Sequence, residues 1–311
     1  MTTHRTALFL CSVLGGLCLA ETALAQEKPS ITVLEPSGPW HLDMGEHKCR
    51  LARLFGDEKN ETLFIMDQWD PSTSASWAVA GPTVEAFRNG RKTQYDFGSG
   101  GDSGEFDLLG SNFGEYGNAV QAYSSFVADE PQDDEGENDE AERDWLADPR
   151  GLPALDSEGA TQIEWLTVSQ RGRTAVRLHL GSLEKPFAAM NLCMENLVEA
   201  WGFDLEEQRQ VAAPPEVTNK RRVVREVASR YPGSALRDGA QADFHIRMTI
   251  DRTGAVEECV LMNQTVAENF DLDNHPCKVF GRYARIEPAR DTEGRPVRTY
   301  LTNRIAYRMG K

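Results

Sequence analysis

The sequence predicts an α+β protein. It begins with a mostly antiparallel, sandwich-like β domain closed by one helix and ends with a smaller domain of a three-stranded antiparallel sheet and helices. Two observations lead to this prediction. Short apolar or alternating runs, typical of strands, recur through the first half of the chain and are followed by one segment with helical apolar spacing. Alternating runs then return near the C-terminus.

Five short segments of the first domain carry strand patterns. Residues 174–180 alternate apolar and polar side chains, which indicates that one face is buried. They follow Gln170-Arg171-Gly172-Arg173, and this run predicts a hairpin with residues 162–169 because Gly readily adopts positive φ. The other candidates are residues 62–66, 76–79 and 105–108.

One helix is predicted to close this domain. Pro186 suits its first turn and Gly202 suits its end. Between them, apolar side chains recur at steps of three and four residues, which places them on one helix face. These residues are Phe187, Met190, Met194, Leu197, Val198 and Trp201.

The first 25 residues have the layout of a secretory signal. His4 and Arg5 give a basic start, residues 7–20 are almost wholly apolar, and Ala23-Leu24-Ala25 is a small-residue cleavage site. The apolar run is shorter than the about 20 residues that span a bilayer. We therefore predict cleavage after Ala25, a periplasmic location and no stable membrane span in the mature chain. The alternative is an uncleaved anchor on the periplasmic side of the inner membrane.

Four cysteines remain after such cleavage, and an even number in an oxidising compartment predicts disulfides. Four cysteines allow three connectivities. Cys259 and Cys277 lie in one apparent domain, so we pair them with each other and Cys49 with Cys193. No Cys-x-x-Cys or His-Glu-x-x-His spacing predicts a metal site.

Charge divides the chain unevenly. The formal net charge is −16, but residues 216–311 hold 17 Lys and Arg against 13 Asp and Glu, a net of +4, so the remainder carries −20. Such an acidic part repels nucleic acid, and we predict no nucleic-acid partner. Residues 129–144 are strongly acidic and predict a disordered, solvated loop. A calcium site is the alternative there, but the spacing of an EF-hand loop is missing.

The first domain holds no recognised catalytic or cofactor motif, so we predict a binding protein rather than an enzyme. The candidates for chemistry are isolated polar residues. The glycine-rich loop lacks the lysine of a phosphate-binding loop, and its serine lacks the Gly-x-Ser-x-Gly context. These candidates are Cys49 with His41 and His47, Ser103 within residues 98–104, and the carboxylates Asp67 and Asp70.

We predict an acidic β-rich domain at residues 26–207, a linker at 208–218 and a second domain at 219–311. The Ala213-Pro214-Pro215 run favours an extended linker. Residues 220–227 are predicted to form a helix with a basic face. After it, a strand with alternating apolar residues spans 244–250.

Several motifs of the second domain occur in a recognisable order. Tyr231-Pro232, Ala235 and Gly239 precede the alternating strand, and the Asp251-Arg252-Thr253-Gly254 turn leads to a second strand containing Val256 and Val260. Further along are Phe270-Asp271, Glu287-Pro288-Ala289 and Gly294-Arg295-Pro296-Val297, before a last strand through Ile305 and Tyr307. This order resembles the C-terminal domain of TonB energy transducers over residues 230–311. The resemblance also fits a disulfide between Cys259 and Cys277.

The resemblance implies capture of an extended peptide from an outer-membrane receptor, added as a strand to an open sheet edge. We predict this edge in the last strand: Thr299, Tyr300, Leu301, Thr302, Asn303, Arg304, Ile305, Ala306 and Tyr307. The expected partners are periplasmic or outer-membrane proteins, including proteins that resemble TonB-dependent receptors. A homodimer formed by exchanged edge strands is an alternative.

The rest of the chain departs from an energy transducer. Such a protein needs a retained N-terminal membrane helix and a long proline-rich spacer, whereas here the start is predicted to be cleaved and an acidic domain replaces the spacer. We therefore expect a periplasmic coupling or binding protein. The alternatives are a membrane-anchored energy transducer and an enzyme with an unrecognised site in the first domain.

Overall fold

The computed structural model describes residues 30–108, 111–127, 151–230, 242–263 and 276–307, together with positions 233 and 237. The predicted signal and the acidic segment 129–144 lie outside the described residues. So do Tyr231-Pro232, Ala235, Gly239 and Phe270-Asp271 of the TonB-like motifs.

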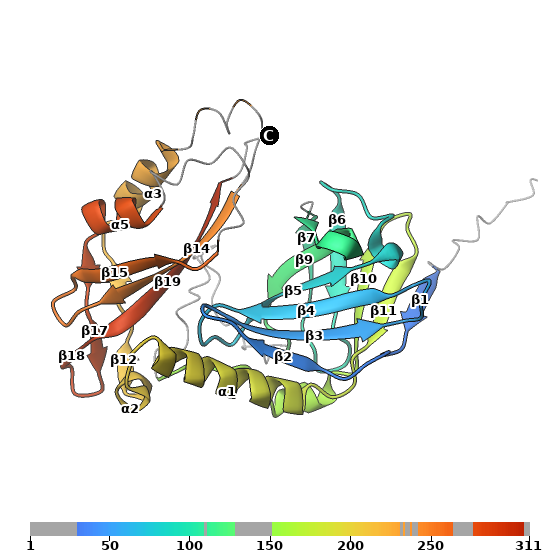
Figure 1. Ribbon diagram of the computed structural model, residues 1–311, viewed down its shortest axis with the longest axis horizontal. Coiled ribbons are helices and arrows are strands. Elements are labelled where there is room, and N and C mark those ends of the chain that lie inside the picture. The colour runs from blue at the N-terminus through green and yellow to red at the C-terminus, as the bar shows by residue number, and fades with distance from the viewer. Residues whose placement is uncertain are drawn as a thin grey trace, which may run out of the picture.

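Two sheets build the N-terminal part, residues 30–209 (Figure 1). The larger sheet has the order β2-β3-β4-β5-β9-β8, and all its neighbouring strands are antiparallel. Its strands are β2 (His41–Met44), β3 (Cys49–Phe55), β4 (Thr62–Gln68), β5 (Ala75–Ala80), β8 (Ser111–Asn112) and β9 (Asn118–Ser124).

The second sheet has the order β1-β11-β10-β6-β7. It is antiparallel except for the parallel pair β1–β11. Its strands are β1 (Ile31–Leu34), β6 (Lys92–Asp96), β7 (Ser103–Asp107), β10 (Trp165–Gln170) and β11 (Ala175–His179). Three short 3₁₀ turns, η1 (Pro82–Val84), η2 (Gly114–Tyr116) and η3 (Gly159–Gln162), lie in the connections.

The two sheets share one aromatic core. Trp77 of β5 makes edge contacts with Tyr95, Phe97 and Phe106 at 5.5, 5.8 and 6.1 Å between ring centroids. The helix α1 (Glu184–Ala200) buries its apolar stripe against the same core. Cys193 of this helix is bonded to Cys49 of β3, so a covalent link joins the helix to the larger sheet. The α+β fold class is confirmed, with a β-rich N-terminal region closed by one helix.

The segment between the two parts contains regular structure. α2 (Leu205–Arg209) is capped by the carboxylate of Asp204, which accepts a hydrogen bond from the Glu207 backbone N–H at 2.9 Å. After it, β12 (Val211–Ala213) and β13 (Glu216–Val217) pair with strands near the C-terminus, β17 (Ala289–Asp291) and β16 (Ile286–Glu287). The predicted linker therefore contributes two short strands to the C-terminal part.

The C-terminal part, residues 211–307, has a three-stranded antiparallel sheet of order β15-β14-β19. One face packs against two helices around a separate core that includes Phe244, Ile246 and Met248. The central strand is β14 (Ala242–Ile250), flanked by β15 (Val256–Leu261) and β19 (Thr299–Tyr307). The helices are α3 (Lys220–Ala228) and α5 (Pro276–Tyr283), and β18 (Pro296–Val297) pairs with β17. Cys259 of β15 is bonded to Cys277 of α5.

The turn between β14 and β15 depends on the side chain of Asp251 and on the glycine at position 254. The Asp251 carboxylate accepts hydrogen bonds from the backbone N–H groups of Thr253 and Ala255, each at 2.8 Å. Gly254 has φ +86°, and a Cβ at this position would overlap the carbonyl oxygen of Ile286. Only glycine avoids both the strain and the overlap. Within the part of the chain that is described, no helix is long and apolar enough to cross a membrane.

Candidate partner-binding edge strand

β19 lies at an edge of the C-terminal sheet. Its whole length, from Thr299 opposite Ile250 to Tyr307 opposite Ala242, is paired with β14. Among the described residues no strand lies on its other side. All nine residues of the predicted partner-binding segment are in this strand.

The hydrogen bonds of β14 reveal which backbone groups of β19 face outward. The His245 N–H donates to the Asn263 side chain at 2.6 Å, and the His245 carbonyl accepts from the Met262 N–H at 2.8 Å. The backbone of His245 is therefore directed toward β15. Because opposite residues of antiparallel strands alternate between bonded and non-bonded pairs, the backbone of Arg304, opposite His245, is directed away from β14. Tyr300 and Thr302 have the same orientation.

The side chains of β19 alternate between two environments. Leu301 and Ile305 pack against the core beneath α3 and α5. Tyr300 and Thr302 face the N-terminal part instead. The Tyr300 ring contacts Trp201 and Phe203 at centroid distances of 5.6 and 5.5 Å.

The second face of the C-terminal sheet is thus covered by the N-terminal part. The Trp69 ring, which follows β4, stacks on His245 at 4.4 Å with an interplanar angle of 22°. At the start of β19, Thr299 Oγ1 also donates to the side chain of Gln208 in α2 at 2.6 Å, which ties this end of the strand to the N-terminal part. The Arg247 guanidinium lies 4.2 Å from the Trp201 ring, a close cation–π contact. We call the whole set of contacts between the N-terminal part and this face of the sheet the docking interface.

Two ionisable groups, one buried and one half-buried, lie at the docking interface. Arg247 is only 7% exposed, its Nε and Nη1 atoms have no hydrogen-bond partner among the described residues, and burial lowers the pKa of its guanidinium. The Asp70 carboxyl accepts a hydrogen bond from the Thr302 hydroxyl, and burial raises its pKa to about 6. Burial and the nearby Asp70 charge also raise the pKa of Tyr300.

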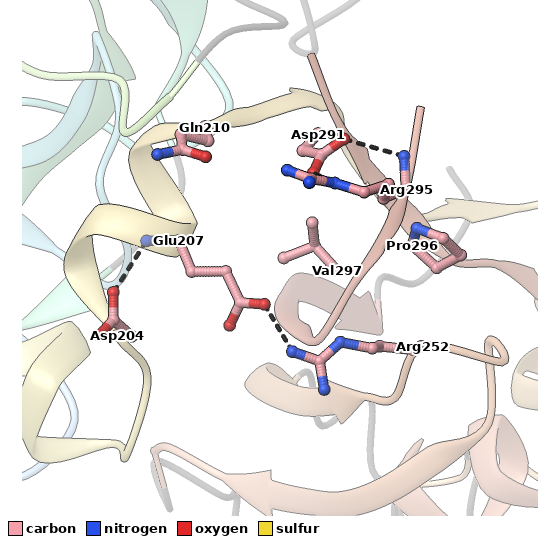
Figure 2. Close-up of a pocket in the computed structure, with 8 residues that line it drawn as sticks. All are labelled: Asp204, Glu207, Gln210, Arg252, Asp291, Arg295, Pro296 and Val297. Atoms are coloured by element: carbon pink, nitrogen blue, oxygen red, sulfur yellow. Dashed lines mark hydrogen bonds and ion pairs between the residues drawn. The ribbon is translucent and has the colours of Figure 1, made fainter. Parts of the chain in front are cut away.

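A cleft of about 530 Å³ opens beside this interface, between α2 and the turns of the C-terminal part (Figure 2). Its carboxylates already have partners. Glu207 pairs with Arg252 at 2.6 Å, and Asp291 pairs with Arg295 at 2.7 Å. The Arg252 pair spans from α2 to the β14–β15 turn. The cleft is therefore better explained as a junction between the two parts than as a ligand site.

The other polar candidates from the sequence are not gathered into one site. Asp67 is held by Arg50 and Lys48, at 2.6 and 2.9 Å, whereas Asp70 contacts Thr302. Ser103 begins strand β7, and Cys49 is in a disulfide. Within the described ranges, no three His, Cys, Asp or Glu side chains are placed to hold a metal ion.

Sequence reasoning did not identify the residues that dock the two parts, chiefly Trp69, Trp201, His245 and Arg247. A usable signal existed for Trp201, which ends the apolar stripe of α1 yet lies beyond the helix itself. No comparable signal marked Trp69.

Comparison with known protein families identifies the C-terminal part. Residues 227–309 match the family model described as "Gram-negative bacterial TonB protein C-terminal". No curated protein and no solved structure matches the chain. The segment from residue 227 to residue 309 therefore belongs to the TonB C-terminal domain family.

Proposed function

We propose that this chain is a non-enzymatic, periplasmic binding or coupling protein whose C-terminal domain captures a segment of an outer-membrane receptor by strand addition to β19. The observation that carries the proposal is the position of β19. It is an edge strand of a TonB-type domain, and the backbone groups of Tyr300, Thr302 and Arg304 are directed away from the sheet. An extended peptide placed there would continue the ladder with main-chain hydrogen bonds.

Further features support this proposal. The TonB C-terminal family is a transport-coupling family without enzymatic activity, and Cys49 is bonded to Cys193 rather than available as a nucleophile. The separate hydrophobic cores support two domains, and residues 211–217 of the proposed linker 208–218 pair with strands of the second one. Cleavage after Ala25 would release this two-domain protein into the periplasm.

The test is capture of outer-membrane receptors from envelope extracts by the purified protein and by an Arg304→Pro variant. Proline removes the outward N–H of residue 304 without removing a hydrogen bond to β14, because this N–H is directed away from β14. We expect receptor affinity to fall at least about tenfold, since one main-chain hydrogen bond is lost and the added strand is displaced.

Arg304→Ala is the matched control, because it removes the same side chain but keeps the backbone N–H. Strand addition predicts that Arg304→Ala retains the receptor while Arg304→Pro loses it, with circular dichroism showing both variants folded. Equal loss in both variants would instead indicate a side-chain contact and would contradict strand addition. Failure of the wild-type protein to capture any receptor would contradict the proposed function as a whole.

A further inference from the structure

Two helices of the C-terminal part expose cations on one surface. α3 buries Val223 and Val227, and α5 buries Val279 and Phe280, in the same core. Their opposite sides face solvent. We call the exposed cations of these helices, with the arginine that follows α5, the basic face: Lys220, Arg221, Arg222, Arg225, Lys278, Arg282 and Arg285.

The positive charge of this face is largely uncompensated. Lys220 is 3.6 Å from Glu216, but Arg221, Arg222, Arg225, Arg282 and Arg285 form no ion pair with any other described residue. The nearby Glu226 is paired with Arg230 at 2.7 Å. Such a concentration of one charge sign produces a local positive potential, although the whole chain has a net charge of −16.

Tyr283 joins the two helices at the centre of this face. The guanidinium groups of Arg222 and Arg282 each lie 5.4 Å from its ring centroid. Arg230 lies 5.0 Å from the same ring and donates a hydrogen bond to the Tyr283 hydroxyl at 3.0 Å. Arg222 of α3 and Arg282 of α5 are thereby held around one ring, which brings cations of the two helices together.

The basic face also exposes an apolar side chain. Val224 is 64% exposed on α3, among the cations rather than over the core. Surfaces that bind at the boundary of a membrane combine cations, which meet lipid phosphates, with apolar and aromatic side chains that enter the headgroup region. In contact with a membrane, Val224 can enter the headgroup region beside the cations; an acidic protein would meet the same charges, and vesicle binding distinguishes the two occupants.

The placement of the acidic part agrees with this interpretation. Figure 1 shows α3 and α5 on the side of the C-terminal sheet away from the N-terminal part, which covers the other face. Residues outside 216–311 carry a net charge of −20 and are repelled by an anionic surface. When the basic face makes the contact, much of this negative charge stays away from the anionic surface.

We propose that the basic face of α3 and α5 binds the anionic phospholipid surface of a membrane. This inference is independent of strand addition at β19, which lies in the sheet beneath the helices. It requires binding that depends on anionic lipid and weakens with salt, because the contact is made by exposed charges.

The experiment is co-sedimentation of the purified protein with vesicles of phosphatidylcholine alone or mixed with phosphatidylglycerol, at low and high salt. The test variant is Arg221→Gln/Arg225→Gln/Arg282→Gln. The matched control, Arg88→Gln/Arg91→Gln/Arg171→Gln, changes the net charge equally but at exposed arginines of the N-terminal part. Each cation near an anionic surface contributes about fivefold, so the test variant should bind about a hundredfold more weakly than wild type.

We expect the control variant to bind anionic vesicles nearly as well as the wild-type protein, because its three changed residues lie outside the basic face. Equal weakening of both triple variants would overturn the proposal, because net charge alone would then explain the binding. So would an absence of wild-type binding to anionic vesicles at low salt. Binding of poly-glutamate that depends on the test arginines, without vesicle binding, would assign the face to an acidic polypeptide and also overturn it.

Discussion

Replacing Cys49 and Cys193 together by alanine is expected to lower the free energy of unfolding by about 5 kcal/mol. The two cysteines are 144 residues apart in sequence, so their bond restricts a very long loop in the unfolded chain. It also holds α1 against β3, where the helix covers the core of the N-terminal part. Both cysteines are changed together so that neither is left as an unpaired, reactive thiol.

The second disulfide provides the comparison. Cys259 and Cys277 are separated by 18 residues, so the same loop-entropy relation predicts a loss of only about 3 kcal/mol. All six tryptophans precede residue 202, and Trp40, Trp77 and Trp165 report on the N-terminal part away from the docking interface. Urea unfolding followed by tryptophan fluorescence should therefore shift strongly for the Cys49/Cys193 variant. The other variant should mainly affect the transition seen by circular dichroism. A Cys49/Cys193 loss below that of Cys259/Cys277 would show that loop length does not control the effect.

Sequence patterns predicted the elements whose own residues show a regular apolar spacing or a clear turn signal. The hairpin around Gly172 forms with φ +76° at this glycine, and the Arg173 N–H donates to the Gln170 carbonyl at 3.0 Å. α1 could be predicted because its apolar stripe is long and regular. β1 and β2 could not, because each has four residues and owes its place to a partner strand. β1 pairs in parallel with β11, across 144 residues of sequence, and β2 is exposed along its whole length.

The edge position of β19 could be expected from the TonB-like motif order, but its docking could not. His245, Arg247 and Thr249 alternate with the apolar residues of β14 and look like a solvated face. In the structure Arg247 and Thr249 are buried, because Trp69 and Trp201 arrive from elements far away in sequence. Strand periodicity identifies the face that is not in the core, but it does not indicate whether a second domain covers that face.

The docking interface is expected to weaken as the pH rises through about 6, because it encloses the Asp70 carboxyl. Burial raises the pKa of this carboxyl from 3.8 to about 6, and the hydrogen bond from Thr302 only partly opposes the rise. A carboxyl with a raised pKa stabilises the folded state fully below its ordinary pKa of 3.8, and this contribution is lost as the pH rises through the folded-state value. The difference amounts to about 3 kcal/mol between acidic and alkaline solution.

Asp70→Asn tests this expectation, because asparagine is neutral at every pH and can still accept the Thr302 hydrogen bond. At about pH 8 the variant should be more stable to urea than the wild-type protein by about 3 kcal/mol, and near pH 4 the two should be nearly equal. Comparison at each pH cancels the titration of every other group, because the two proteins differ only at residue 70.

Asp67→Asn is the control, since Asp67 lies three residues earlier with the opposite electrostatics. Burial opposes ionisation of this carboxyl, but the hydrogen bond from Arg50 and the charge of Lys48 prevail and lower its pKa. Its replacement should therefore destabilise the protein by about 3 kcal/mol or more at both pH values, because two partly buried cations lose their partner. If Asp70→Asn gave no gain at alkaline pH, the carboxyl would not be enclosed in solution, and the two parts would not be docked as the structure shows.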